Sequence, residues 1–471
     1  MNANPAPNRR HFIQAGLAAS LGLPFLAKGQ SEAAGKPGIF DEPHRELPLN
    51  TDADVIVCGA GPAGVAAAIT AARAGAKVRL FETHGSLGGV WTSSLLGYLL
   101  DFDKPGFNVE LVKKLRERDA IHGEGMNGIS YHPEEMKVLL EELCTAAGVK
   151  VQLHTRIAAA HRDGRQLTTI VTESKSGRQA WRAPVFIDTT GDGDLGAMAG
   201  CEFEIGEAKA CPCQPLSMDA LLVVKDAAAL AGIIHGTGKD AKNANAAKAA
   251  FLAEIRRAGS ESSYGAPTLF PIRDNLLLAM MNHEYGVNAT DAAAVSDATI
   301  RARAELQKIV RGLRKLGGIW EGVQIVATPE QIGIRDGRRI KGRYFVNQGD
   351  LTAGARHEDA VVRATFPVDI HALSAEHNKD KPYTNAGVKM KPYDIPLRAL
   401  IARDVDGLMM AGRCISGDFI AHASYRVTGN AVAMGEAAGA VAAIAAQTKR
   451  APHDVPWGEG QAAVVKARAK A

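Results

Sequence analysis

The 471-residue sequence is short of features that mark several classes of protein. Its formal net charge is only +4, which gives no reason to expect a nucleic-acid partner. Its six cysteines show no repeated spacing, which argues against a disulfide framework or a zinc site, and no metal site is expected. The apolar run from Ala15 to Ala27 is too short to span a membrane, so no stable membrane insertion is expected. A hydrophobic content of 46% and 23% charged residues instead indicate a soluble globular protein of two or three domains.

Three of the cysteines lie in distinctive local sequences. Cys58 lies within an apolar run and is expected to be a buried, unreactive thiol. Cys211 and Cys213 are separated by one proline; redox chemistry and metal binding are both open to them, but two ligands without nearby partners favour a packing role.

The N-terminal segment has the composition of a targeting signal. Arg9, Arg10 and Phe12 precede the apolar run, and this order resembles a twin-arginine export signal. That resemblance implies that residues 1–35 are a signal peptide and linker. It also implies a twin-arginine translocon as partner and a periplasmic or extracellular location, reached after folding.

The residues after this segment form the first unit of a dinucleotide-binding fold. An apolar strand from Asp54 to Cys58 runs into a G-x-G-x-x-G turn and then a small-residue helix. A second strand ends in Glu82, at about the spacing of a ribose ligand. The glycine pair after that strand allows the backbone to lie close to a cofactor. The predicted cofactor-binding residues of this part are Gly59, Gly61, Pro62, Ala63, Gly64, Glu82, Gly88 and Gly89.

A second glycine-rich loop raises an alternative. Pro184 to Gly196 is an apolar strand followed by another G-x-G-x-x-G, so a nicotinamide-binding domain has to be considered. No strand ending in an acid follows at the required distance, and the next stretch is Cys-Pro-Cys-Gln-Pro. We therefore expect this loop, with Asp192, to lie against the first cofactor.

The remaining elements follow from periodicity and turn residues. Helices are predicted at 106–120, 133–147, 241–257 and 291–316, a hairpin at 157–173, and strands at 149–153, 276–281, 322–327 and 343–346. A further strand begins at Gly407 and enters Gly412 and Arg413, and a small-residue helix follows at 431–446. Its N-terminal residues Gly429, Asn430 and Ala431 would offer free amides and a positive dipole end to the cofactor.

These elements predict an α/β protein with a Rossmann-like domain, a βββ-type hairpin insertion and an inserted α+β substrate domain. The predicted segments are a signal and linker at 1–35, the first part of the cofactor domain at 50–204, a substrate or cap domain at 205–395, the second part of the cofactor domain at 396–447, and a C-terminal tail at 448–471.

Together the glycine motifs, the Ile332–Ile340 stretch and the segment from Ala411 to Gly435 resemble the FAD-dependent oxidoreductases of the FAD_oxidored type. That group is related to the fumarate reductase and succinate dehydrogenase flavoproteins, within the glutathione-reductase-like fold. The resemblance implies an enzyme that binds FAD, with its pyrophosphate on the turn at Gly61 to Gly64 and its ribose on Glu82. It also implies that Asp192 and Arg413 lie near the ribityl chain or the isoalloxazine ring.

A second likeness concerns the substrate. His422, Arg426 and Asn430 keep the spacing of a His-Gly-x-x-Arg-x-x-x-Asn stretch in fumarate reductases, in which the His and Arg hold substrate carboxylates. Ala423 replaces the glycine, and the other catalytic stretch of that group has no counterpart, so the position carries over but fumarate as substrate does not. No histidine occupies the place of a covalent flavin link, which favours non-covalent FAD.

Four residues are the catalytic candidates: His422, His371, Arg426 and Arg335. Either histidine can be a base near neutral pH, and the arginines, with Arg338 as a further possibility, can hold a carboxylate or an oxyanion. Structural roles, a buried histidine or a surface ion pair, compete with each of these assignments.

The leading hypothesis for function is an exported dehydrogenase or oxidase that moves a hydride from a small polar substrate to flavin N5, with oxygen, a quinone or a redox protein as acceptor. A fumarate-reductase-like reductase of an unsaturated acid and a non-catalytic flavin-binding protein are the alternatives.

Overall fold

The structure is a computed structural model that describes residues 40, 42–125, 128–207, 213–236 and 244–470. The chain divides into two compact units, Met1–Glu46 and Leu47–Ala471. The predicted signal at 1–35 lies outside the described residues, so that prediction stays untested. The helices and strands named below all belong to the second unit.

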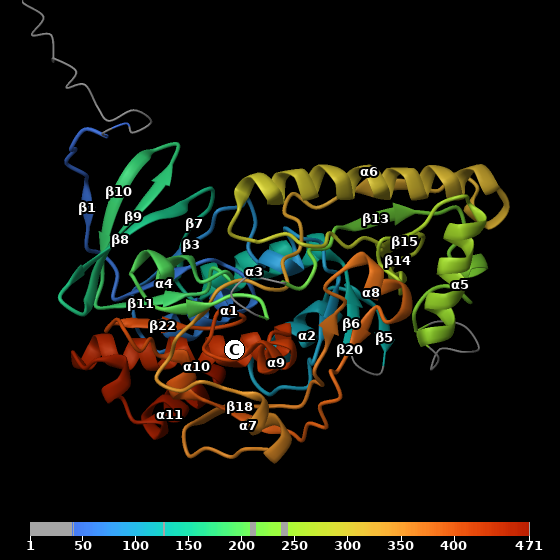
Figure 1. The fold of residues 1–471 in the computed structure, drawn as a ribbon. Coiled ribbons are helices and arrows are strands. Elements are labelled where there is room, and N and C mark those ends of the chain that lie inside the picture. Colours follow the sequence, from blue (N-terminus) through green and yellow to red (C-terminus); the bar gives the residue numbers. More distant parts are fainter. Residues whose placement is uncertain (1–39, 41, 126–127, 208–212, 237–243, 471) are drawn as a thin grey trace, which may run out of the picture. The chain divides into compact units, whose positions relative to one another are not determined.

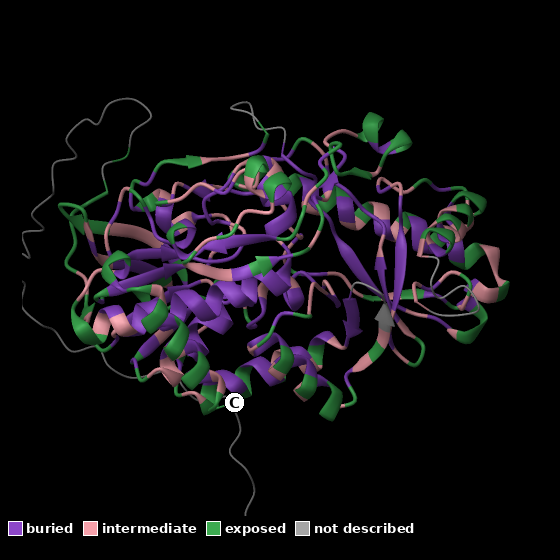
Figure 2. Cartoon of the chain, turned by 90° about the horizontal axis from the view of Figure 1, so that it is seen from below, coloured by how far each residue is buried: buried purple, intermediate pink, exposed green. Residues whose placement is uncertain are grey.

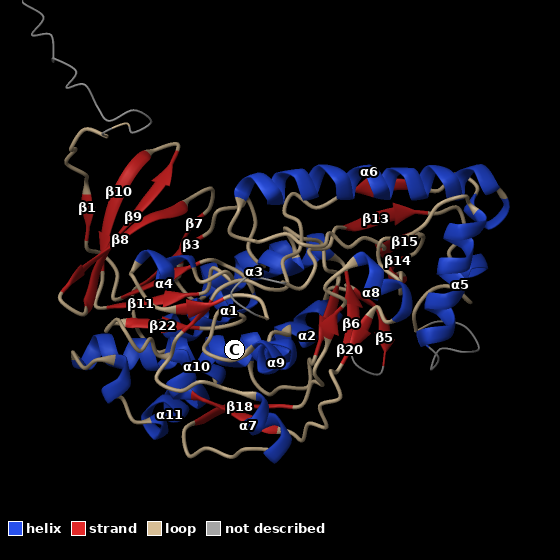
Figure 3. Cartoon of the chain, in the orientation of Figure 1, coloured by secondary structure: helices blue, strands red, loops and turns tan. Residues whose placement is uncertain are grey.

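A five-stranded parallel sheet forms the centre of the cofactor domain (Figures 1 and 3). Its order is β22 (Leu408–Met410), β11 (Val185–Asp188), β2 (Val55–Cys58), β3 (Val78–Phe81) and β7 (Lys150–Gln152). All four pairings are parallel, so the carboxyl ends of the strands share one edge of the sheet, where open α/β sheets bind ligands. The predicted Rossmann-like fold is confirmed.

Two helices of small residues pack tightly beside this sheet. They are α1 (Pro62–Arg73) and α10 (Thr428–Thr448). A Cβ added at Gly435 or Gly439 would lie 2.2 Å from a backbone oxygen of α1, so glycine is required at both helix crossings. Helix α10 is long and apolar enough to cross a membrane, but 89% of its apolar window is buried inside the protein, as expected of a core helix. Figure 2 shows that buried residues fill the interior of the protein and that exposed residues lie on its outer helices.

The predicted hairpin belongs to a second sheet of order β1 (Leu49–Asn50), β10 (Gly177–Arg182), β9 (Gln166–Ser174) and β8 (Arg156–Asp163). Strands β8, β9 and β10 are successive antiparallel strands, which is the predicted βββ insertion, and Gly164 supplies the positive φ of the first turn.

The inserted block contains a four-stranded antiparallel sheet, which we call the cap sheet. Its order is β14 (Thr268–Arg273), β15 (Leu276–Met280), β13 (Asp219–Val223) and β16 (Gln324–Ala327). Figure 1 shows the long helix α6 (Ala292–Leu316) along this sheet and α5 (Ala244–Arg257) at its end. Most buried apolar residues from Leu216 to Ile332 form a hydrophobic cluster of their own, whereas Ile340 and many later core residues join the cluster of the cofactor domain. A small third cluster joins Leu221, Phe270, Ile272 and Leu278 of the cap sheet to Leu95 and Tyr98.

The other elements surround these sheets. The remaining strands are β4 (Tyr98–Leu100), β5 (Ile121–Gly125), β6 (Gly128–Tyr131), β12 (Phe203–Glu204), β17 (Arg339–Ile340), β18 (Ala360–Ala364), β19 (Ile370–His371), β20 (Tyr383–Thr384) and β21 (Tyr393–Pro396). The remaining helices are α2 (Phe107–Glu117), α3 (Pro133–Ala146), α4 (Asp194–Met198), α7 (Gln348–Ala353), α8 (Ala375–Asp380), α9 (Phe419–Tyr425) and α11 (Trp457–Arg468), with short 3₁₀ turns at Gly89–Trp91, Ala228–Leu230, Gly318–Trp320, Leu397–Leu400 and Pro452–Asp454.

The sequence analysis was wrong about one strand and missed others. Residues 343–346 form no strand; Val346 makes a single bridge to Gly417, because this segment pairs with several partners in turn instead of one neighbouring strand. Strands β13 and β14 were not predicted, nor was α11. This helix is held to α10 by a bidentate ion pair in which Arg468 donates at 2.9 Å to both carboxylate oxygens of Glu436.

Candidate active site

The first glycine turn has the shape that a pyrophosphate site needs. Pro62 begins α1, and a Cβ added at Gly64 would lie 1.9 Å from the Gly59 carbonyl oxygen, so helix and turn touch there. At Gly61 an added Cβ would meet nothing within 4 Å, so this backbone faces open space. Ala63 is buried in the first turn of α1. Gly64 therefore allows close packing of helix on turn, and the open backbone at Gly61 leaves room for a pyrophosphate.

Glu82 holds the turn from the next strand. It is buried, and its two carboxylate oxygens accept hydrogen bonds from the backbone N–H of Ala60 at 2.7 Å and of His84 at 3.0 Å. Each oxygen keeps a second lone pair for a ribose hydroxyl. Gly88 donates its N–H to the Ala60 carbonyl at 2.8 Å, and Gly89 lies directly against Gly61. The glycine pair and the first glycine turn therefore lie together at the predicted adenosine site.

The second glycine loop lies beside the first, as predicted. The Thr189 hydroxyl donates to the Gly59 carbonyl at 2.6 Å. The Asp188 carboxylate accepts from Gly196 N–H at 2.8 Å and from the Thr190 hydroxyl at 2.7 Å, and burial raises its pKa to about 6. Because β11 pairs with β2 in the same parallel sheet, this loop lies at the same sheet edge as the first glycine turn.

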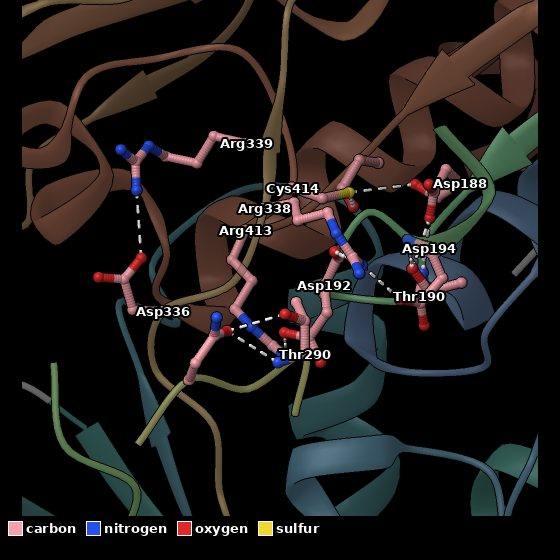
Figure 4. A network of polar contacts seen from close by, with 12 residues as sticks. Asp188, Thr190, Asp192, Asp194, Thr290, Asp336, Arg338, Arg339, Arg413 and Cys414 are labelled. Carbon is pink, nitrogen blue, oxygen red and sulfur yellow. Dashed lines mark hydrogen bonds and ion pairs between the residues drawn. The ribbon is translucent and has the colours of Figure 1, made fainter. Parts of the chain in front are cut away.

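The Arg335–Arg339 stretch divides between structure and site. Figure 4 shows that Arg338 pairs with Asp194 (2.8 Å) and that Arg339 pairs with Asp336 (3.1 Å). Arg339 is buried and also donates to the carbonyls of Gly417 and Gly206. Arg338 and Arg339 therefore join this stretch to the cofactor domain. Of the three arginines at positions 335, 338 and 339, only Arg335 lines the cavity described below.

The second, C-terminal part of the cofactor domain supplies the other wall of the predicted cofactor site. Gly412 follows β22, and the neighbouring Arg413 donates to Asp192 at 2.8 Å (Figure 4). Gly429, Asn430 and Ala431 lie in the first turn of α10, whose N-terminus no side chain caps. Both amide atoms of Asn430 and the Arg413 Nε are buried and make no hydrogen bond within the described residues.

These features fit FAD. A diphosphate suits the open backbone at Gly61 and the dipole of α1, the ribose suits Glu82, and the unpartnered atoms of Asn430 and Arg413 suit the polar edge of an isoalloxazine ring. The 21-residue helix α10 adds a positive dipole end at its N-terminus.

A cavity of about 940 Å³ adjoins this cofactor site. Val90, Arg413, Val427 and Thr428 line it from the cofactor domain. Polar side chains of the inserted block also line it, among them Ser217, Asp219, His235, Lys248, Tyr264, Arg335, Asp369, His371 and Lys381, and Arg426 lines it from the C-terminal part of the cofactor domain. Because cofactor loops and cap residues share these walls, a substrate in this cavity would lie beside the cofactor.

Asp369, His371 and Arg426 form a connected cluster in the cavity wall. The His371 Nε2 lies 3.3 Å from Asp369 Oδ2, and the Arg426 guanidinium donates to the same oxygen at 3.2 Å and to the Asp369 carbonyl at 3.0 Å. Burial, with Arg335 nearby, lowers the pKa of His371 to about 4, so the ring is neutral at pH 7. Its Nδ1 is buried and makes no hydrogen bond to any described residue. The cluster thus contains a neutral imidazole with one free nitrogen.

Arg335 is the second cationic group of the cavity. Its Nη1 donates to the Pro215 carbonyl at 2.9 Å and to the Ser217 hydroxyl at 2.6 Å. Burial, and then the neighbouring Arg426, lower its pKa to about 10, so the guanidinium stays charged at neutral pH. Two of the predicted arginines and one predicted histidine therefore meet in one cavity.

His422 is placed differently. It lies on α9, is fully buried and does not line the cavity. Burial holds its pKa well below the usual value. The Arg413 backbone lies near the ring, but neither ring nitrogen makes a hydrogen bond of normal geometry to a described residue. The structure brings Arg426 but not His422 to the cavity wall, and a substrate role for His422 stays a prediction.

Comparison with known proteins agrees with this geometry. A model of the family described as "FAD dependent oxidoreductase" matches residues 54–467. The chain belongs to this family. It is a flavin enzyme with FAD as its cofactor, so the predicted fold, cofactor and enzyme class are confirmed.

The individual relatives of the oxidoreductase are distant. The chain is 35% identical to a thiamine thiazole synthase of Desulfosudis oleivorans over 97 residues, 20% of this chain and 38% of that protein. It is 33% identical to one of Pyrococcus abyssi over 24% of this chain and 44% of that protein, so it matches less than half the length of either. Among solved structures, a geranylgeranyl bacteriochlorophyll reductase-like protein of Thermoplasma acidophilum is 13% identical, with 90% of this chain and 84% of that chain covered and a TM-score of 0.43. The flavin-dependent brominase Bmp2 is 11% identical, with 88% and 82% covered and a TM-score of 0.45.

Several cavity residues of the oxidoreductase were missed by the sequence analysis. Asp219, Tyr264 and Lys248 line the cavity, and the His283 ring contacts those of Tyr264 and His371, with ring centroids 4.1 and 5.0 Å away. Asp219 begins β13, which was not predicted. The apolar run after it was the available signal for a strand, but nothing local distinguishes this acid from one at a surface.

None of the five cysteines that the structure describes lines the cavity. Cys58, Cys144, Cys201 and Cys414 are buried and free, as expected for Cys58. Cys213 is disulfide-bonded, which differs from the predicted packing role, and Cys211 lies outside the described residues.

Proposed function

We propose that this oxidoreductase is a dehydrogenase or oxidase that removes a hydride from a carbon bearing a hydroxyl or amine on a small polar substrate. FAD, when bound, accepts the hydride at N5. The observation that carries the proposal is the Asp369–His371–Arg426 cluster in a cavity that Arg413 and Thr428 also line from the cofactor loops.

His371 is assigned as the proton acceptor. The Asp369 carboxylate accepts from Nε2–H, which fixes the tautomer and leaves a lone pair on Nδ1. The lowered pKa keeps the ring neutral, so it can take the hydroxyl or ammonium proton of the substrate. Such a positioned base typically contributes a factor of about 10² to 10⁴ in rate.

Arg426, which contacts Asp369 beside His371, supplies positive charge where the substrate loses its proton, and Arg335 adds a second cation to the same cavity. Although burial opposes it, His371, Arg426 and Arg335 hold the pKa of Asp369 below its usual range, so Asp369 stays ionised beside them. Charge in a buried, water-poor site acts strongly on a developing oxyanion. The arginines therefore both bind the substrate and stabilise its deprotonated form.

An anaerobic substrate screen tests the direction of the reaction. FAD-loaded protein is mixed with alcohols, amines or sugars, and loss of the oxidised-flavin absorbance is recorded. In parallel, chemically reduced protein is mixed with unsaturated acids. The proposal expects bleaching in the first experiment. Reoxidation by unsaturated acids alone would favour the alternative, a fumarate-reductase-like reductase, which the spacing of His422 and Arg426 suggested.

The non-catalytic alternative has its own test. A protein that only carries FAD would show no spectral change with any donor or acceptor in either experiment. Acid precipitation tests how FAD is held: non-covalent binding predicts that flavin stays in the supernatant, and a coloured pellet would contradict it.

Export by the twin-arginine route is part of the proposal, supported by Arg9 and Arg10 ahead of the apolar run. In a bacterial host that has this translocon, the wild-type chain is expected in the periplasm or medium, with FAD bound. The double substitution Arg9→Lys and Arg10→Lys should retain it in the cytoplasm; unchanged export would refute the route. The electron acceptor is oxygen, a quinone or a redox protein. The rates at which these candidates reoxidise the reduced flavin distinguish them.

A further inference from the structure

Asp219 is a buried carboxyl group without a partner in the cavity. It is 5% exposed, it lines the cavity, and its Oδ1 makes no hydrogen bond to any described residue. It begins β13, where its cross-strand neighbour is Met280, which in turn pairs with Thr268. All three line the cavity, so this row of the cap sheet faces it. A native buried carboxyl with a free oxygen is costly, which points to a ligand as the missing partner.

Arg335 provides the complementary group. Its Nη1 is fixed by Pro215 and Ser217, and Ser217 lies two residues before Asp219, which places both on the same side of an extended chain. The Nε and Nη2 of Arg335 make no hydrogen bond within the described part of the chain and remain available as donors. Both groups line the same cavity, and the charge of Arg335 opposes the effect of burial on the pKa of Asp219.

The other titratable groups near Asp219 come from three neighbouring segments. Tyr131 on β6 is fully buried, and burial and Asp219 raise its pKa. Tyr98 on β4 and His235 also line the cavity; burial raises the pKa of Tyr98 to about 12 and lowers that of His235. All three are neutral at pH 7, so Arg335 is the charged group that Asp219 faces.

An apolar wall lies next to this pair. Tyr98 and Phe270 stack with ring centroids 4.5 Å apart, and Leu96, Leu100 and Met280 continue the surface in the cavity. Among the residues that the structure describes, the cavity lining carries five cationic side chains, Arg335, Arg413, Arg426, Lys248 and Lys381, against two carboxylates, Asp219 and Asp369. The cavity is thus electropositive with one apolar side.

We propose that Arg335 and Asp219 form a subsite for a carboxylate, and that the substrates are carboxylic acids with an apolar or aromatic tail against Tyr98 and Phe270. The Arg335 guanidinium donates to the bound carboxylate, and Asp219, on taking up one proton from solvent, donates the second hydrogen bond through its O–H. This inference rests on the proposed function for the identity of the substrate but concerns binding only.

The protonation step makes binding depend on pH. Burial raises the pKa of Asp219 to about 7 in the free protein. If only the protonated form accepts the carboxylate, the apparent Kd increases in inverse proportion to the protonated fraction. The Kd should therefore increase about tenfold between pH 6 and pH 8.

Equilibrium titration of the FAD-loaded protein tests this subsite. The probes are 3-phenylpropanoate, acetate and 3-phenylpropan-1-ol, and the readout is the perturbation of the flavin absorbance. The wild type should bind 3-phenylpropanoate at least tenfold more tightly than either other probe, because acetate lacks the phenyl group that the apolar wall would bury and the alcohol lacks the charge that Arg335 would pair. Its Kd should rise with pH as above.

Two variants and a control separate the contributions. Asp219→Asn keeps a donor without a titrating proton, so it should bind the acid with little change between pH 6 and pH 8. Arg335→Met should weaken acid binding at least tenfold at every pH, and Asp226→Asn, an exposed acid after the same strand, should behave as wild type. Equal binding of acid and alcohol, or unchanged pH dependence in Asp219→Asn, would overturn the proposal. Carboxylate binding without any turnover would leave it standing and count against the proposed oxidation instead.

Discussion

Replacing Asp219 by asparagine should make the folded protein more stable at alkaline pH, although it removes a charged group. In the folded state burial raises the pKa of Asp219 to about 7, against a value of 3.8 for an exposed aspartate. A pKa raised by folding favours the folded state least at high pH, because the unfolded carboxyl ionises freely while the buried one resists. This difference of about three units corresponds to about 4 kcal/mol, of which about 3 kcal/mol is lost between pH 5 and pH 8.

The asparagine side chain of the Asp219→Asn variant has no proton to lose, so the variant should escape this loss. The assay is urea denaturation of FAD-saturated protein at pH 5 and pH 8, for wild type, Asp219→Asn and the Asp226→Asn control. The free energy of unfolding of Asp219→Asn relative to wild type should increase by about 3 kcal/mol from pH 5 to pH 8. The same pH dependence in wild type and Asp219→Asn would refute the assignment of Asp219 as a buried, unpartnered carboxyl. It would also remove the stability cost for which ligand binding is the explanation.

Other predictions concern the cofactor turn and the C-terminal helix. Gly61→Ala should lower FAD affinity while leaving the apoprotein stable, because the added methyl projects into open space, whereas Gly64→Ala should also destabilise the fold by about 1–3 kcal/mol, because its Cβ would collide with the Gly59 carbonyl. Fluorescence titration with FAD and thermal unfolding of the apoproteins check this pair, and identical behaviour of the two variants would contradict it. Arg468→Met should cost about 3 kcal/mol, because it leaves the buried Glu436 carboxylate without its partner; urea denaturation measures this, and a change below about 1 kcal/mol would show that the pair is unimportant.

The parts of the site that the sequence predicted depend on local geometry. Gly59, Gly64 and Glu82 follow one another on strand, turn and strand, so their spacing alone determines how they meet. Arg335 and His371 were also identified, through motif position, although the folded chain is what places them together in one cavity.

The parts that were missed depend on tertiary packing. Asp219 becomes a candidate site residue only because the cap sheet buries it next to Arg335, and no local pattern records that burial. The spacing of His422 to Arg426 matched a substrate clamp, but the short helix α9 directs the two residues into different surroundings. Helix α11 is held to the core by the contact of Arg468 with Glu436, 32 residues away, which composition could not reveal.

We propose that oxidation by this FAD-dependent oxidoreductase uses His371 as its proton acceptor. The most direct test is the rate of anaerobic flavin reduction by an active substrate, compared between wild type and His371→Gln, with the exposed His377→Gln as control. If His371 is the proton acceptor, the His371→Gln variant should keep FAD and bind substrate, but its flavin should be reduced about 10² to 10⁴ times more slowly. The His377→Gln control should react at the wild-type rate. Equal reduction rates in wild type and His371→Gln would contradict it.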